Sequence, residues 1–288
     1  MRLCTFEHAG RCETGIVVDD DLLPLSEVNA GRGTDFPTEM LALIASGRRD
    51  ELIASAAGLS GSIPLTETRL RLPYPVPGKI WCIGLNYKSH AEDINAVQPD
   101  EPGSFMKPTS AMFEPGGEIE LPPERVTNEV DAEGELALIF GKRCREISID
   151  NVREALFGYT TTLDLTALDV LARNPRYLQR SKSFDTFFSF GPFITTVDEI
   201  EDVEALEVVT RHNGADFSRD FVRNMRHSPF KLAAFHSDVM TFVPGDILST
   251  GCPKGARIAP GDRVEAVVEG VGRLQATVTR RPAGSILV

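Results

Sequence analysis

Two glutamates separated by one glycine are the most chemically informative residues of this chain. Glu133 and Glu135 open an apolar run that continues to Phe140, and a third acid, Asp164, lies inside the next apolar stretch. Side chains on a β-strand alternate between its two faces, so both glutamates must point to the same side. Like charges on one buried face repel each other unless a cation lies between them. The pattern predicts a site for a hard divalent cation.

A histidine follows the apolar segment that ends at Gly84. If the residues after Asn86 are helical, His90 and Asp93 share one helix face, and the carboxylate can orient the imidazole and favour its charged form. This is the layout of a general base with an orienting carboxylate, and the neighbouring Glu92 is a second candidate for the orienting role. A solvated polar helix with a surface histidine fits the same spacing, so the pattern alone leaves both interpretations open.

Two lysines lie in short contexts marked by aromatic residues and proline. Lys107 is part of Phe-Met-Lys-Pro, and Lys182 is part of Ser-Lys-Ser-Phe. Each lysine taken alone is compatible with an ordinary surface position, because lysine is almost never fully buried unless it is paired. Together with a carboxylate-bound cation, the two lysines fit a pocket for a small anionic oxo acid.

Composition and net charge limit the classes of partner that the protein is expected to bind. The chain has 288 residues and a net charge of −12, which argues against nucleic acid or an anionic membrane as a partner. No stretch approaches the roughly 20 apolar residues that span a bilayer, and the first residues lack a signal-peptide pattern, so we expect a cytoplasmic protein. The five cysteines are scattered without a Cys-x-x-Cys pair and are expected to be reduced thiols.

The strands and helices expected from the sequence, which must position these residues, suggest two domains. Residues 1–75 are expected to form a small N-terminal α/β module without chemistry, and residues 76–288 a β-rich catalytic domain, so the fold class is α+β and mainly β. The expected strands are 2–8, 14–18, 79–84, 135–140, 159–166, 193–197, 204–212, 262–269 and 273–280. The expected helices are two short ones within 37–53, then 150–156 and 228–238.

An ordered set of motifs resembles the fumarylacetoacetate hydrolase family across residues 77 to 280. The set comprises Ile83-Gly-Leu-Asn-Tyr87 with His90, Phe105-Met-Lys-Pro108, Glu133-Gly-Glu-Leu136, Gly158-Tyr159 with Asp164, Lys182-Ser-Phe-Asp-Thr-Phe187, Gly191-Pro192, Asn213-Gly214, Pro244-Gly-Asp-Ile247 and Thr250-Gly-Cys-Pro253. The resemblance implies a mixed β-roll or sandwich catalytic domain, a homodimer and chemistry on short oxo acids.

The resemblance also implies a metal site. Its ligands would be Glu133, Glu135 and Asp164, and its cofactor Mg²⁺ or Mn²⁺. Three carboxylates with no cysteine or histidine ligand nearby form an all-oxygen set, which suits these hard cations better than zinc or copper. About three octahedral positions would remain for water or substrate. An edge strand with outward-facing acids is the alternative explanation of the glutamate pair taken alone, and it predicts no metal dependence.

The implied reaction is the hydrolysis of a 2,4-dioxo acid, an acylpyruvate or sugar-derived diketo acid, to pyruvate and a carboxylic acid. His90 would take a proton from the attacking water, and Lys182 would neutralise a developing oxyanion or the substrate carboxylate. Lys107 would help to close the pocket, and the backbone and hydroxyl groups around Thr250 and Gly251 would bind the carboxylate.

Other readings of the same residues remain open. The metal site would also serve an oxaloacetate decarboxylase or tautomerase, or an isomerase of an unsaturated 2-oxo diacid, which differ in needing no attacking water. A calcium-binding or purely structural β-domain is disfavoured, because the glutamates open a strand and no EF-hand loop occurs. Four departures from the family pattern suggest a substrate other than the commonest ones, with a more polar or sugar-derived tail. They are Asp93 in place of glutamate, Leu168 in place of a basic residue, Ser218 in place of glutamine and Cys252 in place of threonine.

Overall fold

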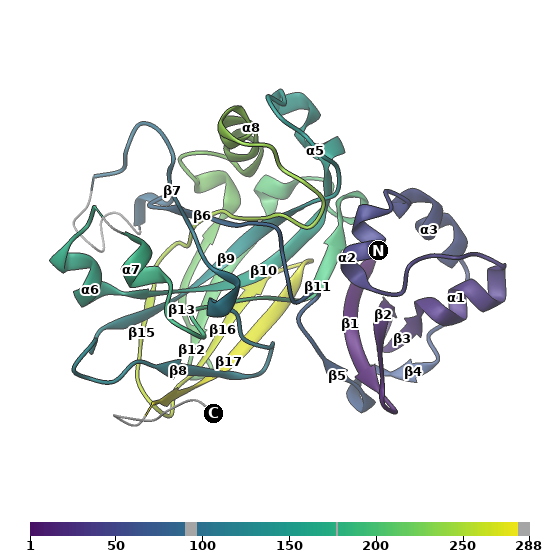
Figure 1. Ribbon diagram of the computed structural model, residues 1–288, viewed down its shortest axis with the longest axis horizontal. Coiled ribbons are helices and arrows are strands. Elements are labelled where there is room, and N and C mark those ends of the chain that lie inside the picture. Colours follow the sequence, from purple (N-terminus) through teal and green to yellow (C-terminus); the bar gives the residue numbers. More distant parts are fainter. Residues whose placement is uncertain (90–96, 177, 282–288) are drawn as a thin grey trace.

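Two β-sheets form the centre of the molecule, as the computed structural model shows for residues 1–89, 97–176 and 178–281 (Figure 1). The larger sheet follows the order β4-β3-β2-β1-β11-β10-β9-β14-β6-β7, with β5 paired to β1 and β15 paired to β9. The smaller sheet follows the order β13-β12-β16-β17-β8. This mainly β arrangement with peripheral helices confirms the expected fold class.

The described elements have the following bounds. The larger sheet comprises β1 (Arg2–His8), β2 (Arg11–Val18), β3 (Asp21–Pro24), β4 (Ile63–Pro64), β5 (Arg69–Leu70), β6 (Ile80–Gly84), β7 (Gly103–Met106), β9 (Val130–Phe140), β10 (Leu156–Ala167), β11 (Phe188–Thr196), β14 (Ile247–Ser249) and β15 (Ala256–Ile258). The smaller sheet comprises β8 (Glu118–Leu121), β12 (Glu207–His212), β13 (Ala215–Phe221), β16 (Arg263–Val268) and β17 (Gly272–Arg280). The helices are α1 (Leu25–Arg32), α2 (Met40–Ala45), α3 (Arg49–Ala56), α5 (Val152–Ala155), α6 (Leu168–Arg173), α7 (Leu178–Lys182) and α8 (Pro229–Val239).

Strands β9 and β10 form the buried spine of the larger sheet. Every residue of both strands is buried. Gly134 lets the smaller sheet approach, because a Cβ at this position would lie 2.8 Å from the Thr210 hydroxyl and 3.0 Å from the Ala266 methyl group. The Gly134 amide also donates a hydrogen bond to the Thr210 hydroxyl. The glycine between the two glutamates therefore serves the contact between sheets.

The N-terminal segment joins the same sheet. β1 runs antiparallel to β11, with Leu3 opposite Ile194, and β2 and β3 extend the sheet beyond it. The helices α1, α2 and α3 lie beside these strands in Figure 1. Buried residues from both parts of the chain, such as Leu25 and Leu163, belong to one hydrophobic cluster. Backbone pairing and a shared core thus connect residues 1–75 to the rest of the molecule.

The structure refines several predicted elements. β9 begins at Val130, so Glu133 and Glu135 lie inside the strand rather than at its head. The helix predicted over 150–156 is shortened to α5, because Leu156 already begins the long strand β10. The predicted helix with His90 and Asp93 lies outside the described residues. Among the described helices, none has the length and apolar character needed to cross a membrane.

Candidate active site

Strand register brings the three predicted acids together. In the antiparallel pair of β9 and β10, Glu133 lies opposite Asp164 and Glu135 lies opposite Thr162. Residues opposite each other on paired strands share a face of the sheet, so all three carboxylates project to the same side. Their exposed fractions are 4% for Glu133, 1% for Glu135 and 0% for Asp164. Three acids this deeply buried require compensation by cations or hydrogen-bond donors.

Glu135 receives hydrogen bonds but contacts no cation among the described residues. The Ser249 hydroxyl on β14 donates to its Oε2 at 2.5 Å, and the Gly251 amide donates to the same oxygen at 3.0 Å. Burial, together with the charges of Asp164 and Glu133, raises the pKa of Glu135 to about 8. A cation beside this carboxylate would relieve that penalty, because it would favour the ionised form.

Two buried lysines neutralise Asp164. The Lys182 ammonium lies 3.0 Å from Glu133 Oε2 and 3.0 Å from Asp164 Oδ2, and the Lys107 ammonium lies 2.5 Å from Asp164 Oδ1. Lys107 also donates to the carbonyl oxygens of Leu165 and Phe187, at 2.9 Å and 2.6 Å. The surface interpretation of the two lysines is therefore wrong, since carboxylate partners compensate the burial of both ammonium groups.

The electrostatic environments of the two lysines differ. Burial lowers the pKa of Lys107, although Asp164 acts in the opposite direction. For Lys182, burial acts in the same direction as it does for Lys107, but the charges of Asp164, Glu133 and Glu135 outweigh it and raise the pKa. Lys182 therefore stays charged beside the cavity described below.

The structure adds a donor that the sequence analysis did not include. Glu133, Glu135 and Cys252 each place one potential ligand atom within 4.8 Å of the others. The loop after β14 brings this distant cysteine beside β9, next to two of the three expected oxygen ligands. The only sequence signal for this thiol was the presence of cysteine in place of threonine in Thr250-Gly-Cys-Pro253. Two carboxylates and a thiol at this spacing fit a divalent cation, while both Asp164 oxygens contact lysine ammonium groups.

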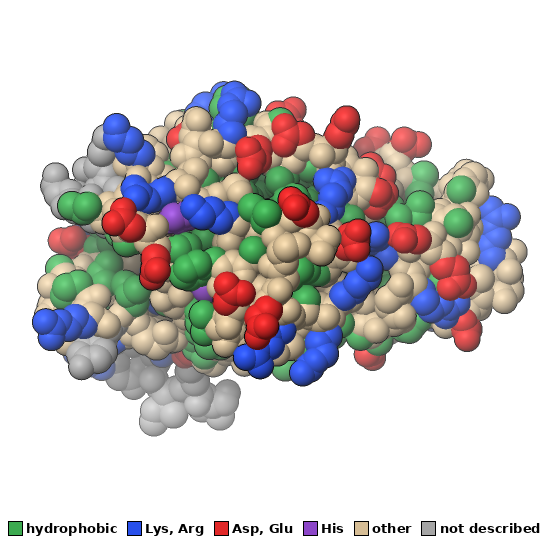
Figure 2. All heavy atoms as spheres, turned by 90° about the horizontal axis from the view of Figure 1, so that it is seen from above, with side chains coloured by type: hydrophobic (Ala, Val, Ile, Leu, Met, Phe, Trp, Pro, Cys, Tyr) green, Lys and Arg blue, Asp and Glu red, His purple; other side chains and the backbone are tan. Residues whose placement is uncertain are grey.

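These groups border a cavity of about 310 Å³. Its polar lining residues are Glu133, Glu135, Thr166, Lys182 and Cys252. Most of the remaining wall is apolar, and it is formed by Ile83, Leu85, Pro99, Phe105, Leu168, Leu171, Pro175 and Leu178. In Figure 2, hydrophobic side chains gather at the left end of the molecule, the end that carries α6 and α7 in Figure 1. Apart from the polar residues named above, the described wall of this cavity offers mainly apolar contacts.

Thr250 and Gly251 support the site from outside the cavity. The Thr250 amide and hydroxyl both donate to the Leu136 carbonyl oxygen, at 3.0 Å and 2.8 Å. The Gly251 amide is bonded to Glu135. The donors predicted to bind a substrate carboxylate are thus used within the protein, and the loop positions Glu135 and Cys252 instead. Lys107 likewise lies behind Asp164 and does not line the cavity.

The predicted general base cannot be placed, because His90, Asp93 and Glu92 lie outside the described residues. The residue before this segment is described, and the Ser89 hydroxyl donates to the Pro253 carbonyl oxygen at 2.9 Å. Pro253 follows Cys252 directly. The chain therefore passes the edge of the candidate site immediately before residue 90.

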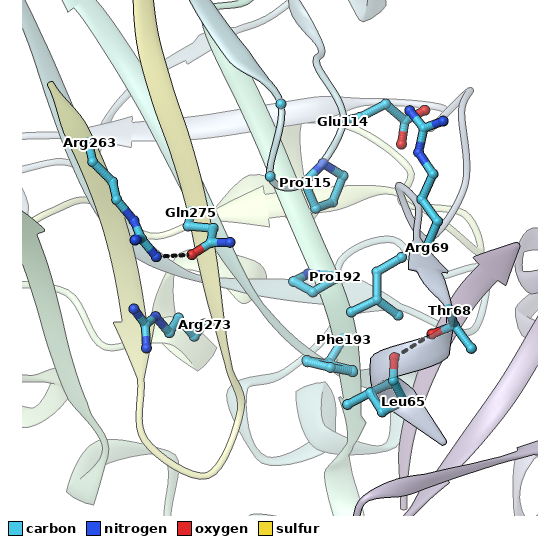
Figure 3. Close-up of a pocket in the computed structure, with 13 residues that line it drawn as sticks. Leu65, Thr68, Arg69, Glu114, Pro115, Pro192, Phe193, Arg263, Arg273 and Gln275 are labelled. Carbon is cyan, nitrogen blue, oxygen red and sulfur yellow. Dashed lines mark hydrogen bonds between the residues drawn. The ribbon is translucent and has the colours of Figure 1, made fainter. Parts of the chain in front are cut away.

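A second cavity, of about 660 Å³, lies between the N-terminal strands and the β16–β17 hairpin (Figure 3). Arg263 donates to Gln275, and Glu265 lies 3.1 Å from the Arg263 guanidinium and 2.5 Å from that of Arg273. None of the predicted site residues lines this cavity. Because two of its arginines already share a buried carboxylate, we assign the chemistry to the smaller cavity.

Comparisons with known proteins agree with the fold described above. Residues 79–279 match the family model described as "Fumarylacetoacetate (FAA) hydrolase C-terminal". Oxaloacetate tautomerase YisK of Bacillus subtilis is 31% identical over 300 residues, which cover 95% of this chain and 98% of that protein. The human mitochondrial oxaloacetate tautomerase FAHD2B is 33% identical over 249 residues, covering 82% of this chain and 78% of that protein.

Solved structures show the same fold along nearly the whole chain. Maleylpyruvate hydrolase from Sphingobium sp. SYK-6, in complex with manganese(II) and pyruvate, is 31% identical with a TM-score of 0.79, covering 98% of this chain and 100% of that one. The 5-carboxymethyl-2-hydroxymuconate delta-isomerase from Mycobacterium smegmatis is 27% identical with a TM-score of 0.76, at the same coverage. Hydrolases, isomerases and tautomerases thus occur among the relatives, and the chain belongs to the fumarylacetoacetate hydrolase family.

Proposed function

We propose that this protein is a divalent-metal-dependent hydrolase that cleaves the C3–C4 bond of a 2,4-dioxo acid, giving pyruvate and a carboxylic acid. The observation that carries the proposal is the buried pair Glu133 and Glu135 in the wall of a cavity that Lys182 also lines. The manganese and pyruvate in the related maleylpyruvate hydrolase support both the metal and the product.

Glu133 and Glu135 would hold the cation, Mg²⁺ or Mn²⁺, and Asp164 is the third ligand implied by the sequence resemblance. When bound, the cation would supply Lewis-acid polarisation of the 2-oxo group and positive charge for the electron pair released by bond cleavage. Ser249 and the Gly251 amide fix the orientation of Glu135, since both donate to its Oε2. Pre-set carboxylates reduce the reorganisation needed to bind both ion and substrate.

Lys182 is the group in this cavity best placed to meet substrate charge. Its ammonium is anchored 3.0 Å from Glu133 and 3.0 Å from Asp164, and the residue lines the cavity. A fixed positive charge in a water-poor site stabilises a developing oxyanion more strongly than a mobile one. Lys107 acts from behind by holding Asp164 in position.

His90 remains our proposed base, with Asp93 or Glu92 orienting its imidazole. It would remove a proton from water as the water oxygen attacks the C4 carbonyl. Cleavage then leaves the C3–C4 electron pair on C3, delocalised onto the 2-oxo oxygen, and protonation of C3 gives pyruvate. The C4 fragment leaves as the carboxylic acid, so the reaction consumes one water.

The apolar wall favours acylpyruvates whose acyl group is an alkyl or aryl chain. Leu168, Leu171 and Leu178 face the cavity from α6 and α7. Burying each methylene of such a tail contributes about 0.8 kcal/mol to binding, whereas a second carboxylate would lose hydration without a free basic partner among the described lining residues.

A second candidate is an oxaloacetate tautomerase or decarboxylase, or an isomerase of an unsaturated 2-oxo diacid. The similarity to two proteins named oxaloacetate tautomerases favours it. The substitution His90→Ala separates the candidates: a hydrolase loses pyruvate release from acylpyruvates, whereas tautomerisation or decarboxylation needs no attacking water.

The proposal is tested by pyruvate release from a panel of 2,4-dioxo acids and oxaloacetate with Mg²⁺, Mn²⁺ or EDTA. Wild type and Glu135→Ala are compared. Metal-dependent pyruvate from dioxo acids, lost in the variant, is the expected result. Turnover of oxaloacetate alone, measured as pyruvate for decarboxylation or as loss of enol absorbance for tautomerisation, would instead favour the second candidate. No metal-dependent turnover in either assay would contradict the hydrolase and both oxaloacetate reactions.

We also propose that the protein works as a cytoplasmic homodimer on a small oxo acid. The homodimer follows from the family resemblance, and the cytoplasmic location from the composition of the sequence. Sedimentation equilibrium measures the mass directly: twice the chain mass of 31.5 kDa is expected, and the mass of one chain would contradict the dimer.

A further inference from the structure

The loop after β14 holds Cys252 in a fixed place against β9. Thr250 is bonded to the Leu136 carbonyl through both its amide and its hydroxyl, at 3.0 Å and 2.8 Å. The Asn86 amide group donates to the Thr250 carbonyl oxygen at 2.8 Å. The next amide, of Gly251, donates to Glu135 itself at 3.0 Å. The residue before Cys252 is therefore tied directly to a predicted metal ligand.

Backbone geometry restricts this loop further. Gly251 has a φ of +95°, and a Cβ there would lie 2.9 Å from the Asn86 Cβ. Only glycine meets both conditions without strain. The position of the Cys252 thiol is thus set by a constrained turn, and a donor held in place loses little entropy when it binds an ion.

The thiol is directed to the same space as the two glutamates. Cys252 lines the same cavity as Glu133 and Glu135, and its exposed fraction is 2%. One atom from each of the three residues lies within 4.8 Å of the others. Metal–oxygen and metal–sulfur bonds of about 2.0 to 2.3 Å place two ligands of one ion at most about 4.6 Å apart, so little adjustment is needed.

We infer that Cys252 is a ligand of the cation held by Glu133 and Glu135, and that this site therefore binds thiophilic divalent ions such as Cd²⁺, Zn²⁺ and Co²⁺. This inference rests on the proposed metal site and concerns its chemistry. Thiolate ligands select softer ions than carboxylates do, and an all-oxygen site would lack this preference. On binding, the thiol gives its proton to solvent and one sulfur–metal bond forms, without any change of oxidation state.

The test uses the full-length, metal-free protein and ultraviolet absorption. Titration with Cd²⁺ should produce a sulfur-to-metal charge-transfer band that saturates at one ion per chain. Cys252→Ser should abolish the band and weaken Cd²⁺ binding at least tenfold, while changing Mg²⁺ affinity less than threefold. Cys12→Ser removes the exposed cysteine and should leave the band unchanged. Glu135→Gln should weaken Cd²⁺ binding as well, because it removes a second ligand.

The outcomes separate this inference from the proposed function. A Cd²⁺ band of equal strength and affinity in folded Cys252→Ser, or no band in wild type, overturns the thiol ligand even if pyruvate is released with Mg²⁺. A Cys252-dependent band establishes the ligand even if no dioxo acid is cleaved. Circular dichroism of each variant verifies that it is folded, and Cys252→Thr provides a second variant that retains a hydroxyl in place of the thiol.

Discussion

The surroundings of Glu135 disfavour its ionised form in the metal-free protein. It is buried, its bonded partners are neutral donors, and neighbouring carboxylates add to the effect of burial. A carboxyl group whose pKa is raised to about 8 makes the metal-free protein less stable at the pH where the group must ionise. Such a position is compatible with a metal ligand, since the bound ion would remove the penalty.

This environment predicts that the free energy of unfolding of the metal-free protein depends on pH. In EDTA, the wild-type free energy of unfolding should fall as pH rises from about 5 to 8, because folded Glu135 keeps its proton while the unfolded chain, with an ordinary pKa of 4.5, has lost it. Glu135→Gln should flatten this part of the curve and exceed wild type at pH 8 by on the order of 4 kcal/mol. Urea unfolding at several pH values measures both curves, and parallel curves would contradict the prediction.

Leu168 is the residue most directly connected to substrate choice. It stands at the first position of α6 and lines the cavity, where the family pattern has a basic residue. Leu168→Arg should lower kcat/KM for alkyl acylpyruvates and raise it for dicarboxylic substrates by roughly 10 to 100-fold, the range of a charged hydrogen bond. Leu168→Met, which conserves volume, is the matched control. Equal losses on both substrate types in Leu168→Arg would show that the residue does not select the tail.

At the scale of secondary-structure elements, the site residues that can be predicted from the sequence are those on regular strands. Period-two alternation places Glu133 and Glu135 on one face from sequence alone, and the buried strand containing Asp164 was identified by its apolar pattern. Their exact register, which sets Asp164 opposite Glu133, follows from long-range pairing that no local pattern encodes. The same is true of Cys252, whose loop reaches β9 through hydrogen bonds to Leu136.

Gly134 allows the packing of the two sheets to be tested. Gly134→Ala should destabilise the protein by about 1 to 3 kcal/mol, because the added methyl group would meet Thr210 and Ala266 at 2.8 Å and 3.0 Å. Gly31→Ala, within α1 and with no atom from outside the helix within 4 Å of the added Cβ, is the control and should be neutral or slightly stabilising. Thermal unfolding of the two variants measures the difference, and equal melting temperatures would argue against tight sheet packing at Gly134.

At the scale of the whole molecule, the sequence predicts two domains, and in the structure β1 of the first pairs with β11 of the second while residues of both belong to one core. The local patterns that place a boundary near residue 75 carry no information about which strand edges meet. The face seen in Figure 2 has interspersed acidic and basic side chains, without a continuous basic patch.

The shared sheet predicts cooperative unfolding. Calorimetry of the full chain should show one transition, because melting residues 1–75 would expose the edge of β11 and part of the common core. A chain beginning at residue 76 should melt at a lower temperature than the full chain. Two separated transitions in the full chain, with the second matching that of the truncated chain, would instead describe independent domains.

Metal-dependent cleavage at Glu133 and Glu135 is tested by titrating metal-free protein with Mn²⁺ during turnover of an alkyl acylpyruvate. Pyruvate formation should rise with bound Mn²⁺, saturate at one ion per chain, and be abolished by Glu133→Gln in a protein that remains folded. Pyruvate formation that persists in EDTA, or that is unchanged by Glu133→Gln, would contradict a metal-dependent reaction at this site.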